Sequence, residues 1–139
     1  MKIKIENGKE YIFDIVRRKY IRNQPEEWVR QNIIQYLHEE KGYPISLMGI
    51  EKKNEINNIK KRCDIICYDT NGQPLLLVEC KSQNSKLNPE TFNQTISYQT
   101  TLKAKYLLIT NGKAHYCFHI VGKSLVFLNT IPSYQNIKQ

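Results

Sequence analysis

The most constraining feature of the sequence is an apolar run that ends in charge: residues 74–81 have the sequence PLLLVECK. A run of this kind is typical of a strand buried on both faces of a sheet. Side chains two apart in a strand share a face, so Glu79 and Lys81 project together and Cys80 faces the other way. A carboxylate and an ammonium there are costly to bury without a partner or a metal. The sequence therefore predicts a central strand with a chemically active end.

A second apolar strand, residues 62–68, is expected directly before this one. The segment Asp69-Thr70-Asn71-Gly72 has the composition of a turn, which predicts an antiparallel hairpin. Asp64 lies about as far before that turn as Glu79 lies after it, so the two acids are expected to meet. Carboxylates without His or Cys ligands suit Mg²⁺ or Mn²⁺. With Lys81 to orient a metal-bound water, this is an apparatus for phosphodiester hydrolysis.

The remaining elements predict an α/β fold, a central mixed sheet flanked by helices. We expect one domain over residues 1–139, with an N-terminal hairpin over about 1–16 turned at Asn7-Gly8 and a core over about 20–130. The expected helices are 23–41 and 88–103, the other strands are 45–51, 105–110, 114–121 and 124–128, the polar stretch 52–61 is a surface loop, and the tail from Pro132 is frayed.

The charge of the chain favours an anionic partner. There are 21 Lys and Arg against 13 Asp and Glu, a formal net charge of +8. Such an excess attracts polyanions through counterion release and long-range steering. Basic residues gather at residues 17–22 and again at Lys60, Lys61 and Arg62, directly before the candidate metal ligand. We expect both clusters, the N-terminal arginines and the one at the end of the polar loop, to contact nucleic-acid phosphates.

The sequence predicts a cytoplasmic protein without a membrane segment. No apolar run approaches the roughly 20 residues of a membrane span. The N-terminal segment alternates apolar and charged residues, unlike a signal peptide. The four cysteines, Cys63, Cys67, Cys80 and Cys117, lack CxxC or zinc-type spacing, so each is expected to be a small reduced core residue.

Several short segments occur in an order that is typical of one family. They are Pro25–Gln31 (PEEWVRQ), Gly42-Tyr43-Pro44, Glu51, Lys61–Ile65, Leu76–Lys81, Gln94 with Tyr98, and Thr110-Asn111-Gly112. Together they resemble the N-terminal nuclease domain of type I restriction enzyme R subunits, a branch of the PD-(D/E)XK superfamily, over roughly residues 17–112.

The resemblance implies a restriction-endonuclease-like core and metal-dependent DNA cleavage. In that family the aspartate and the ExK glutamate hold Mg²⁺ or Mn²⁺ and the lysine is catalytic. These roles carry over to Asp64, Glu79 and Lys81, and the carbonyl of Cys80 is a further ligand.

The expected second helix carries another motif of the resemblance. Gln94 and Tyr98 are similar to the Gln-x-x-x-Tyr pair shared with exonuclease V-like nucleases. A spacing of four places both side chains on one helical face, toward the active site or the DNA backbone. Glu51 is either an additional acid beside the metal or the exposed end of its strand.

Two charged residues of the first helix, Glu26 and Arg30, are also candidates. A helical wheel places Glu26 nearer than Glu27 to the apolar stripe, so Glu26 is expected to approach the site. Arg30 lies beside the stripe and is expected to contact DNA. As alternatives, Glu26 and Arg30 complement the helix dipole or are simply solvated.

Two functions are open from the sequence. The first is a magnesium-dependent deoxyribonuclease related to restriction or repair. The motor domains that follow in an R subunit are not in this sequence. The alternative is therefore a DNA-binding accessory module, catalytically weak or inactive, with a partner protein that supplies the motor or the specificity. The presence of Asp64, Glu79 and Lys81 together favours activity. A homodimer is compatible with both.

Overall fold

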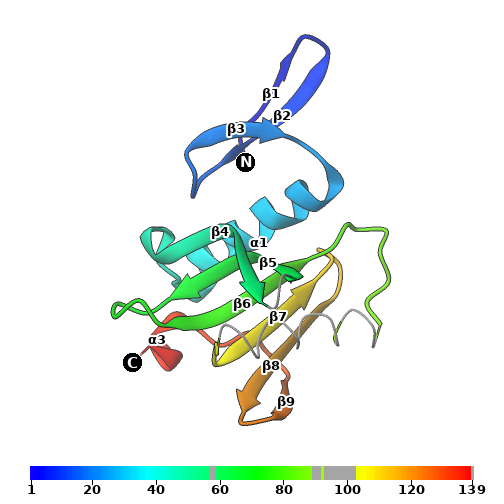
Figure 1. The fold of residues 1–139 in the computed structure, drawn as a ribbon. Coiled ribbons are helices and arrows are strands. Elements are labelled where there is room, and N and C mark those ends of the chain that lie inside the picture. Colours follow the sequence, from blue (N-terminus) through cyan, green and yellow to red (C-terminus); the bar gives the residue numbers. More distant parts are fainter. Residues whose placement is uncertain (57–58, 89–91, 93–102, 139) are drawn as a thin grey trace.

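The computed structural model describes residues 1–56, 59–88, 92 and 103–138. These residues form a three-stranded sheet and a six-stranded sheet, and one long helix, α1, lies between the two (Figure 1). The fold is therefore a β-rich mixed α/β arrangement. Among the described helices none is long and apolar enough to cross a membrane.

The N-terminal sheet consists of β1 (Ile3–Glu6), β2 (Lys9–Asp14) and β3 (Lys19–Arg22), all antiparallel. The predicted turn is present, because Asn7 and Gly8 have φ angles of 53° and 75°. The strand β3 was not predicted, since a four-residue strand with three exposed residues has almost no apolar alternation to reveal it.

Helix α1 (Pro25–Lys41) confirms the predicted first helix and begins two residues later than expected. Pro25 occupies the first turn, where its missing N–H is not needed. The helix ends at Gly42, which adopts a left-handed φ of 75° and donates its N–H to the carbonyl of Leu37. The buried residues of α1 include Val29, Ile33 and Leu37, so the apolar stripe faces the core as predicted.

The larger sheet follows the short helix η1 (Ile45–Leu47). Its strands are β4 (Met48–Ile56), β5 (Ile59–Tyr68), β6 (Pro74–Cys80), β7 (Tyr106–Thr110), β8 (His115–Val121) and β9 (Ser124–Leu128), in that spatial order. Neighbours are antiparallel except β6 and β7, which are parallel. The sheet is mixed, as predicted. The predicted helix 88–103 falls in the connection from β6 to β7, almost wholly outside the described residues.

The polar stretch 52–61 was predicted wrongly as a surface loop. Residues 52–56 continue β4 and residues 59–61 begin β5, and the ladder pairs Lys53 with Arg62 and Glu55 with Lys60. In a hairpin the two strands satisfy each other's backbone N–H and C=O groups, so no buried face is required. A prediction that depends on an apolar face therefore misses it.

The core lies on both faces of the large sheet. One cluster joins α1 to the sheet through residues such as Ile34, Ile65 and Val78. A smaller cluster on the opposite face contains Leu77 and Leu107. Three of the four cysteines, Cys67, Cys80 and Cys117, are buried and reduced, as predicted, while the side chain of Cys63 lies outside the description.

The C-terminal tail was predicted to fray, and this prediction is wrong. Residues Tyr134–Ile137 form a short helix, α3, capped by the hydroxyl of Ser133. Tyr134 and Ile137 are buried in the core cluster beneath α1. The hydroxyl of Tyr43 donates a hydrogen bond to the carbonyl of Pro132, 2.9 Å away, which fixes the start of this segment.

Candidate active site

The antiparallel pairing of β5 and β6 brings the two predicted acids together. Ile65 is opposite Val78, so one further step along the ladder leads to Asp64 and Glu79. On the other side of β5, Ile50 is opposite Ile65 and Lys52 is opposite Cys63. The backbone of Glu51 therefore lies across from that of Asp64. Three acidic positions thus form a row across β4, β5 and β6, although the side chain of Glu51 is outside the described part.

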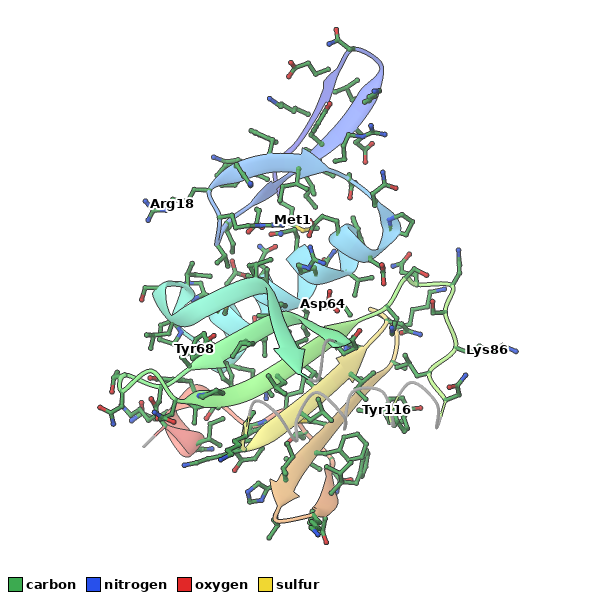
Figure 2. The ribbon with its side chains drawn as sticks, in the orientation of Figure 1. Met1, Arg18, Asp64, Tyr68, Lys86 and Tyr116 are labelled. Carbon is green, nitrogen blue, oxygen red and sulfur yellow. The ribbon has the colours of Figure 1, made fainter. Side chains whose placement is uncertain are left out.

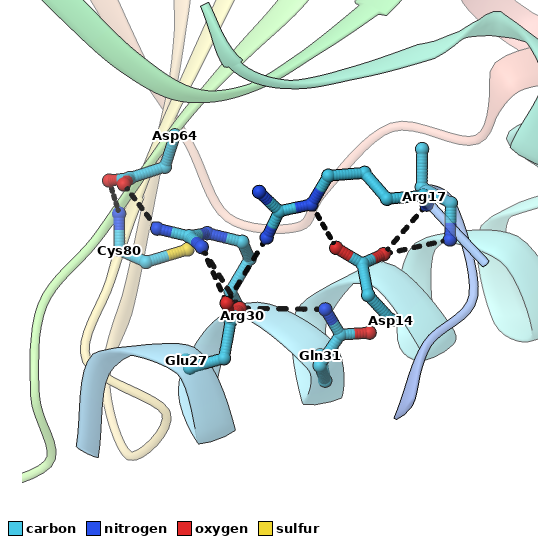
Figure 3. Close-up of polar contacts among 8 residues, drawn as sticks. Asp14, Arg17, Glu27, Arg30, Gln31, Asp64 and Cys80 are labelled. Carbon is cyan, nitrogen blue, oxygen red and sulfur yellow. Dashed lines mark hydrogen bonds and ion pairs between the residues drawn. The ribbon is translucent and has the colours of Figure 1, made fainter. Parts of the chain in front are cut away.

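Both oxygens of the Asp64 carboxylate accept hydrogen bonds inside the protein. Oδ1 accepts from the Nη2 of Arg30 at 3.0 Å, and Oδ2 accepts from the backbone N–H of Cys80 at 2.8 Å (Figure 3). Asp64 is only 8% exposed. Figure 2 places it at the end of the large sheet next to α1. A buried carboxylate held by two donors from two elements has a fixed orientation.

Glu79 and Lys81 meet beside Asp64, as strand parity predicts. The Nζ of Lys81 lies 3.3 Å from Oε1 of Glu79, and both side chains are partly buried. The other oxygen of Glu79, Oε2, is buried and has no hydrogen-bond partner among the described residues. A buried carboxylate oxygen in this state is unusual and suits a cation ligand.

The pKa of Glu79 is raised by its surroundings. Burial is the largest cause that raises its pKa, to about 7, and the negative charge of Asp64 is the next. The charge and hydrogen bond of Lys81 oppose the shift only in part, and Glu26 adds a smaller upward contribution. A divalent cation would relieve this repulsion by neutralising both carboxylates at once.

The residues present fit a magnesium-type ion in their chemistry. Mg²⁺ binds through one or two carboxylates and retains several waters. Asp64 and Glu79 supply that number, and the carbonyl of Cys80 is the further ligand that the resemblance implies. In the described part of the chain no group of three His, Cys, Asp or Glu side chains gathers to hold a metal.

Helix α1 contributes differently from what the helical wheel predicts. Glu26 is exposed, although its charge is felt by Glu79. Glu27, placed further from the apolar stripe by the wheel, is buried, and both its oxygens accept from Nη1 of Arg30 at 2.9 Å. Arg30 is 3% exposed and extends to Asp64. The guanidinium of Arg30 therefore binds two buried carboxylates, and its expected contact with DNA stays a prediction.

Several other predicted residues cannot be placed. The side chains of Lys60, Lys61 and Arg62 lie outside the described part, but their backbone belongs to strand β5 and not to a loop. Gln94 and Tyr98, of the Gln-x-x-x-Tyr motif, are outside the described residues altogether. Their predicted contacts with the site or with DNA remain predictions.

The turn after β7, Thr110-Asn111-Gly112, supports the site, and the sequence did not predict this role. The carbonyl of Thr110 accepts the N–H of Lys81 at 2.8 Å, and Nδ2 of Asn111 donates to the carbonyl of Ser85 at 2.9 Å. Gly112 has a φ of 88°, and a Cβ at this position would lie 3.3 Å from Cγ2 of Val29 in α1. The turn therefore fixes the segment that carries Lys81. The sequence signal was the Asn-Gly pair, which marks a turn but not its contacts.

Comparison with known proteins places these residues in context. The family model described as "Type I restriction enzyme R protein N terminus (HSDR_N)" matches residues 25–132. Among solved structures, the chain is similar to a fragment assigned as an HsdR subunit of a type I restriction enzyme from Vibrio vulnificus YJ016. The TM-score is 0.62 at 18% identity, covering 82% of this chain but 24% of that one. The chain thus matches about a quarter of that protein fragment. No curated protein matches.

Proposed function

Because the chain belongs to the family of type I restriction enzyme R protein N termini, we propose that it is a metal-dependent deoxyribonuclease with a restriction-endonuclease-like core. Its substrate is DNA, and the reaction is hydrolysis of a phosphodiester bond. The observation that carries the proposal is the trio of Asp64, Glu79 and Lys81 at one end of the large sheet. The buried carboxylate of Asp64 and the partly buried carboxylate and ammonium of Glu79 and Lys81 meet there, on adjacent strands.

Each residue has a separate task in this reaction. Asp64 and Glu79 would hold Mg²⁺ or Mn²⁺, with the Cys80 carbonyl as a further ligand. The bound ion supplies Lewis-acid neutralisation of phosphate charge and lowers the pKa of water. Lys81 would hold the attacking water through its ammonium and would stabilise negative charge that develops on the phosphate. Its contact with Glu79 keeps the ammonium at the site.

Further residues support the site in this proposal. We propose that Glu51, opposite Asp64 in the ladder, completes the acidic row, and that Glu26 acts through its charge. We also propose that Gln94 and Tyr98 contribute to the active site, and that Lys60, Lys61 and Arg62 bind DNA phosphates. A net charge of +8 supports the binding of a polyanion.

The test is cleavage of linear, circular and single-stranded DNA with Mg²⁺ or Mn²⁺. An Asp64→Asn substitution is expected to lower the rate roughly 100-fold or more, the scale of removing one electrostatic contributor. Asp69→Asn is the matched control. Asp69 is also buried, in the turn of the same hairpin at the opposite end, and there its carboxylate accepts hydrogen bonds from the backbone N–H groups of Asn71 and Gln73.

If the unsubstituted protein and Asp64→Asn are equally inert on every substrate, the nuclease proposal is wrong. Retained DNA binding with a steep salt dependence would then support the accessory module that works with a partner protein. Equal loss in Asp64→Asn and Asp69→Asn would instead mean that the substitutions unfold the hairpin, and a melting curve of each variant detects this.

A further inference from the structure

A chain of alternating charges runs from the N-terminal sheet to the candidate metal ligand. Its members are Asp14, Arg17, Glu27, Arg30 and Asp64, and we call it the ion-pair chain (Figure 3). Arg17 donates from Nε to Asp14 and from Nη2 to Glu27 at 3.2 Å. Arg30 donates to both oxygens of Glu27 and to Asp64. Four of the five members are buried, and the side chain of Arg17 is 26% exposed.

The ion-pair chain connects three elements that are far apart in sequence. Asp14 ends β2 and also accepts the N–H groups of Val16 and Arg17, so the turn between β2 and β3 is built around its carboxylate. Glu27 and Arg30 lie one turn apart on α1. Asp64 lies on β5. The N-terminal sheet is therefore linked by charges to the large sheet, with α1 between them.

Stability alone does not explain such a chain. A buried ion pair is often no more stabilising than an apolar replacement of the same volume, because desolvation offsets the attraction. What the pairs do provide is a fixed orientation of the side chains that they join. The planar guanidinium of Arg30 binds Glu27 with one nitrogen and Asp64 with another, and only an arginine has this fork. The position of the Asp64 carboxylate therefore depends on where Glu27 and Arg17 hold that fork.

We propose that Arg17 and Arg30 are positioning residues that act on Asp64 through the ion-pair chain, and that the N-terminal sheet is thereby a support of the metal site. The inference rests on the proposed role of Asp64 as a metal ligand. It assigns a function to a turn residue, Arg17, whose side chain pairs with Asp14 and Glu27. It also explains why an arginine lies beside a cation site.

Electrostatics and positioning predict opposite effects on metal affinity. Removing a positive charge near the site should strengthen Mn²⁺ binding if charge alone matters. If Arg17 positions Asp64, its removal should weaken Mn²⁺ binding. Arg18→Gln provides the baseline, because Arg18 is the next residue, carries the same charge, is exposed and points away from the body of the protein (Figure 2).

The first measurement is Mn²⁺ affinity by calorimetry, without DNA, for the unsubstituted protein, Arg17→Gln, Arg30→Lys and Arg18→Gln. Arg30→Lys keeps the charge but loses the fork, and we expect affinity to fall roughly tenfold, the lower end for a residue that orients a metal ligand. Arg17→Gln should weaken binding about threefold, as for coupled members of one network. Arg18→Gln should leave the affinity unchanged or slightly stronger.

The second measurement needs no metal. The N–H of Cys80 donates to Asp64, whereas the N–H of the next residue, Lys81, donates to Thr110. Hydrogen exchange of the Cys80 amide, taken relative to the Lys81 amide, therefore reports the orientation of Asp64 and not general loosening. We expect this ratio to rise roughly tenfold in Arg30→Lys, the loss of one hydrogen bond to a charged group, and to rise less in Arg17→Gln.

The outcomes separate the inference from the proposed function. If the unsubstituted protein binds Mn²⁺ through Asp64, but Arg17→Gln matches Arg18→Gln in both measurements, the inference is wrong and the proposed function stands. If the unsubstituted protein binds no Mn²⁺, or Asp64→Asn binds it as tightly, the proposed function fails and the inference fails with it. Should Arg30→Lys not fold, the pair Arg17→Gln and Arg18→Gln decides by itself, because Arg17 is partly exposed.

Discussion

The backbone N–H of Cys80 donates a hydrogen bond of 2.8 Å to Oδ2 of Asp64. Cys80 is the middle residue of the tripeptide that also carries Glu79 and Lys81, so the backbone of β6 orients the acid of β5. The same contact keeps the charge of Asp64 close to Glu79, whose pKa is raised to about 7. One hydrogen bond thus links the geometry of the candidate site to its acid–base behaviour.

Glu79 should make the metal-free protein less stable as the pH rises. Its folded pKa of about 7 lies above the ordinary value of 4.5. The stability that protonation provides is therefore fully present below about pH 4.5 and is lost as the pH rises through about 7. The upper limit of the loss is on the order of 3 kcal/mol. Chemical unfolding across this range measures it.

The control for this prediction is Glu79→Gln, which remains neutral at every pH. It should unfold with a flatter pH profile than the unsubstituted protein. The difference between the two profiles isolates Glu79 from other groups, such as His115, whose pKa is lowered by burial and which acts in the opposite direction. Parallel profiles would show that Glu79 ionises normally.

Metal affinity should rise with pH for the same reason. A carboxylate must lose its proton before it binds a cation, so Mn²⁺ competes with the proton on Glu79. Between about pH 5.5 and 6.5 the affinity is expected to increase close to tenfold, and above about pH 7.5 it should level off. Calorimetry in buffers with different ionisation enthalpies counts the protons released. Release of none at the lower pH would contradict the prediction.

The parts of the site that sequence could predict are local. Turn chemistry at residues 69–72 predicted the hairpin, though not the register shift between Cys67 and Tyr68, and strand parity placed Glu79 and Lys81 on one side. These rules need only neighbouring residues. The burial of Glu27 was not predicted, because it depends on ion pairs with Arg17 and Arg30. A helical wheel considers only the positions of apolar residues and does not include ion pairs.

The same reasoning explains the errors in the fold. The hairpin of β4 and β5 continues through polar residues that pair backbone to backbone, without the alternation on which strand prediction depends. At the C-terminus, Tyr134 and Ile137 are three residues apart and follow a capping Ser133, a pattern that does predict a helical turn. The polar residues around them concealed that signal.

Tyr43→Phe should destabilise the protein by about 1 kcal/mol, because the buried hydroxyl donates to the carbonyl of Pro132 and its loss leaves that carbonyl without this donor. The substitution should loosen α3, whose Tyr134 packs edge-to-face on the ring of Tyr43. Tyr36→Phe, at an exposed tyrosine of α1, should change stability by less than about 0.5 kcal/mol. Thermal unfolding compares the two, and equal melting temperatures would contradict the role of the Tyr43 hydroxyl.

Gly112→Ala should impair both stability and cleavage, because the turn after β7 supports Lys81. A Cβ at Gly112 would lie 3.3 Å from Cγ2 of Val29, and the φ of 88° disfavours any side chain. Gly122→Ala is the matched control: its φ of 62° is also left-handed, but a Cβ there meets nothing within 4 Å. We expect Gly112→Ala to be less stable than Gly122→Ala by about 1 kcal/mol or more, the scale of overpacking.

The same substitution should also displace Lys81. The N–H of Gly112 donates to Oγ1 of Thr110, and the carbonyl of Thr110 accepts the N–H of Lys81, so a shift that relieves the contact with Val29 should move Lys81 as well. A DNA cleavage rate equal to that of Gly122→Ala, measured well below both melting temperatures, would show that Lys81 does not depend on this turn.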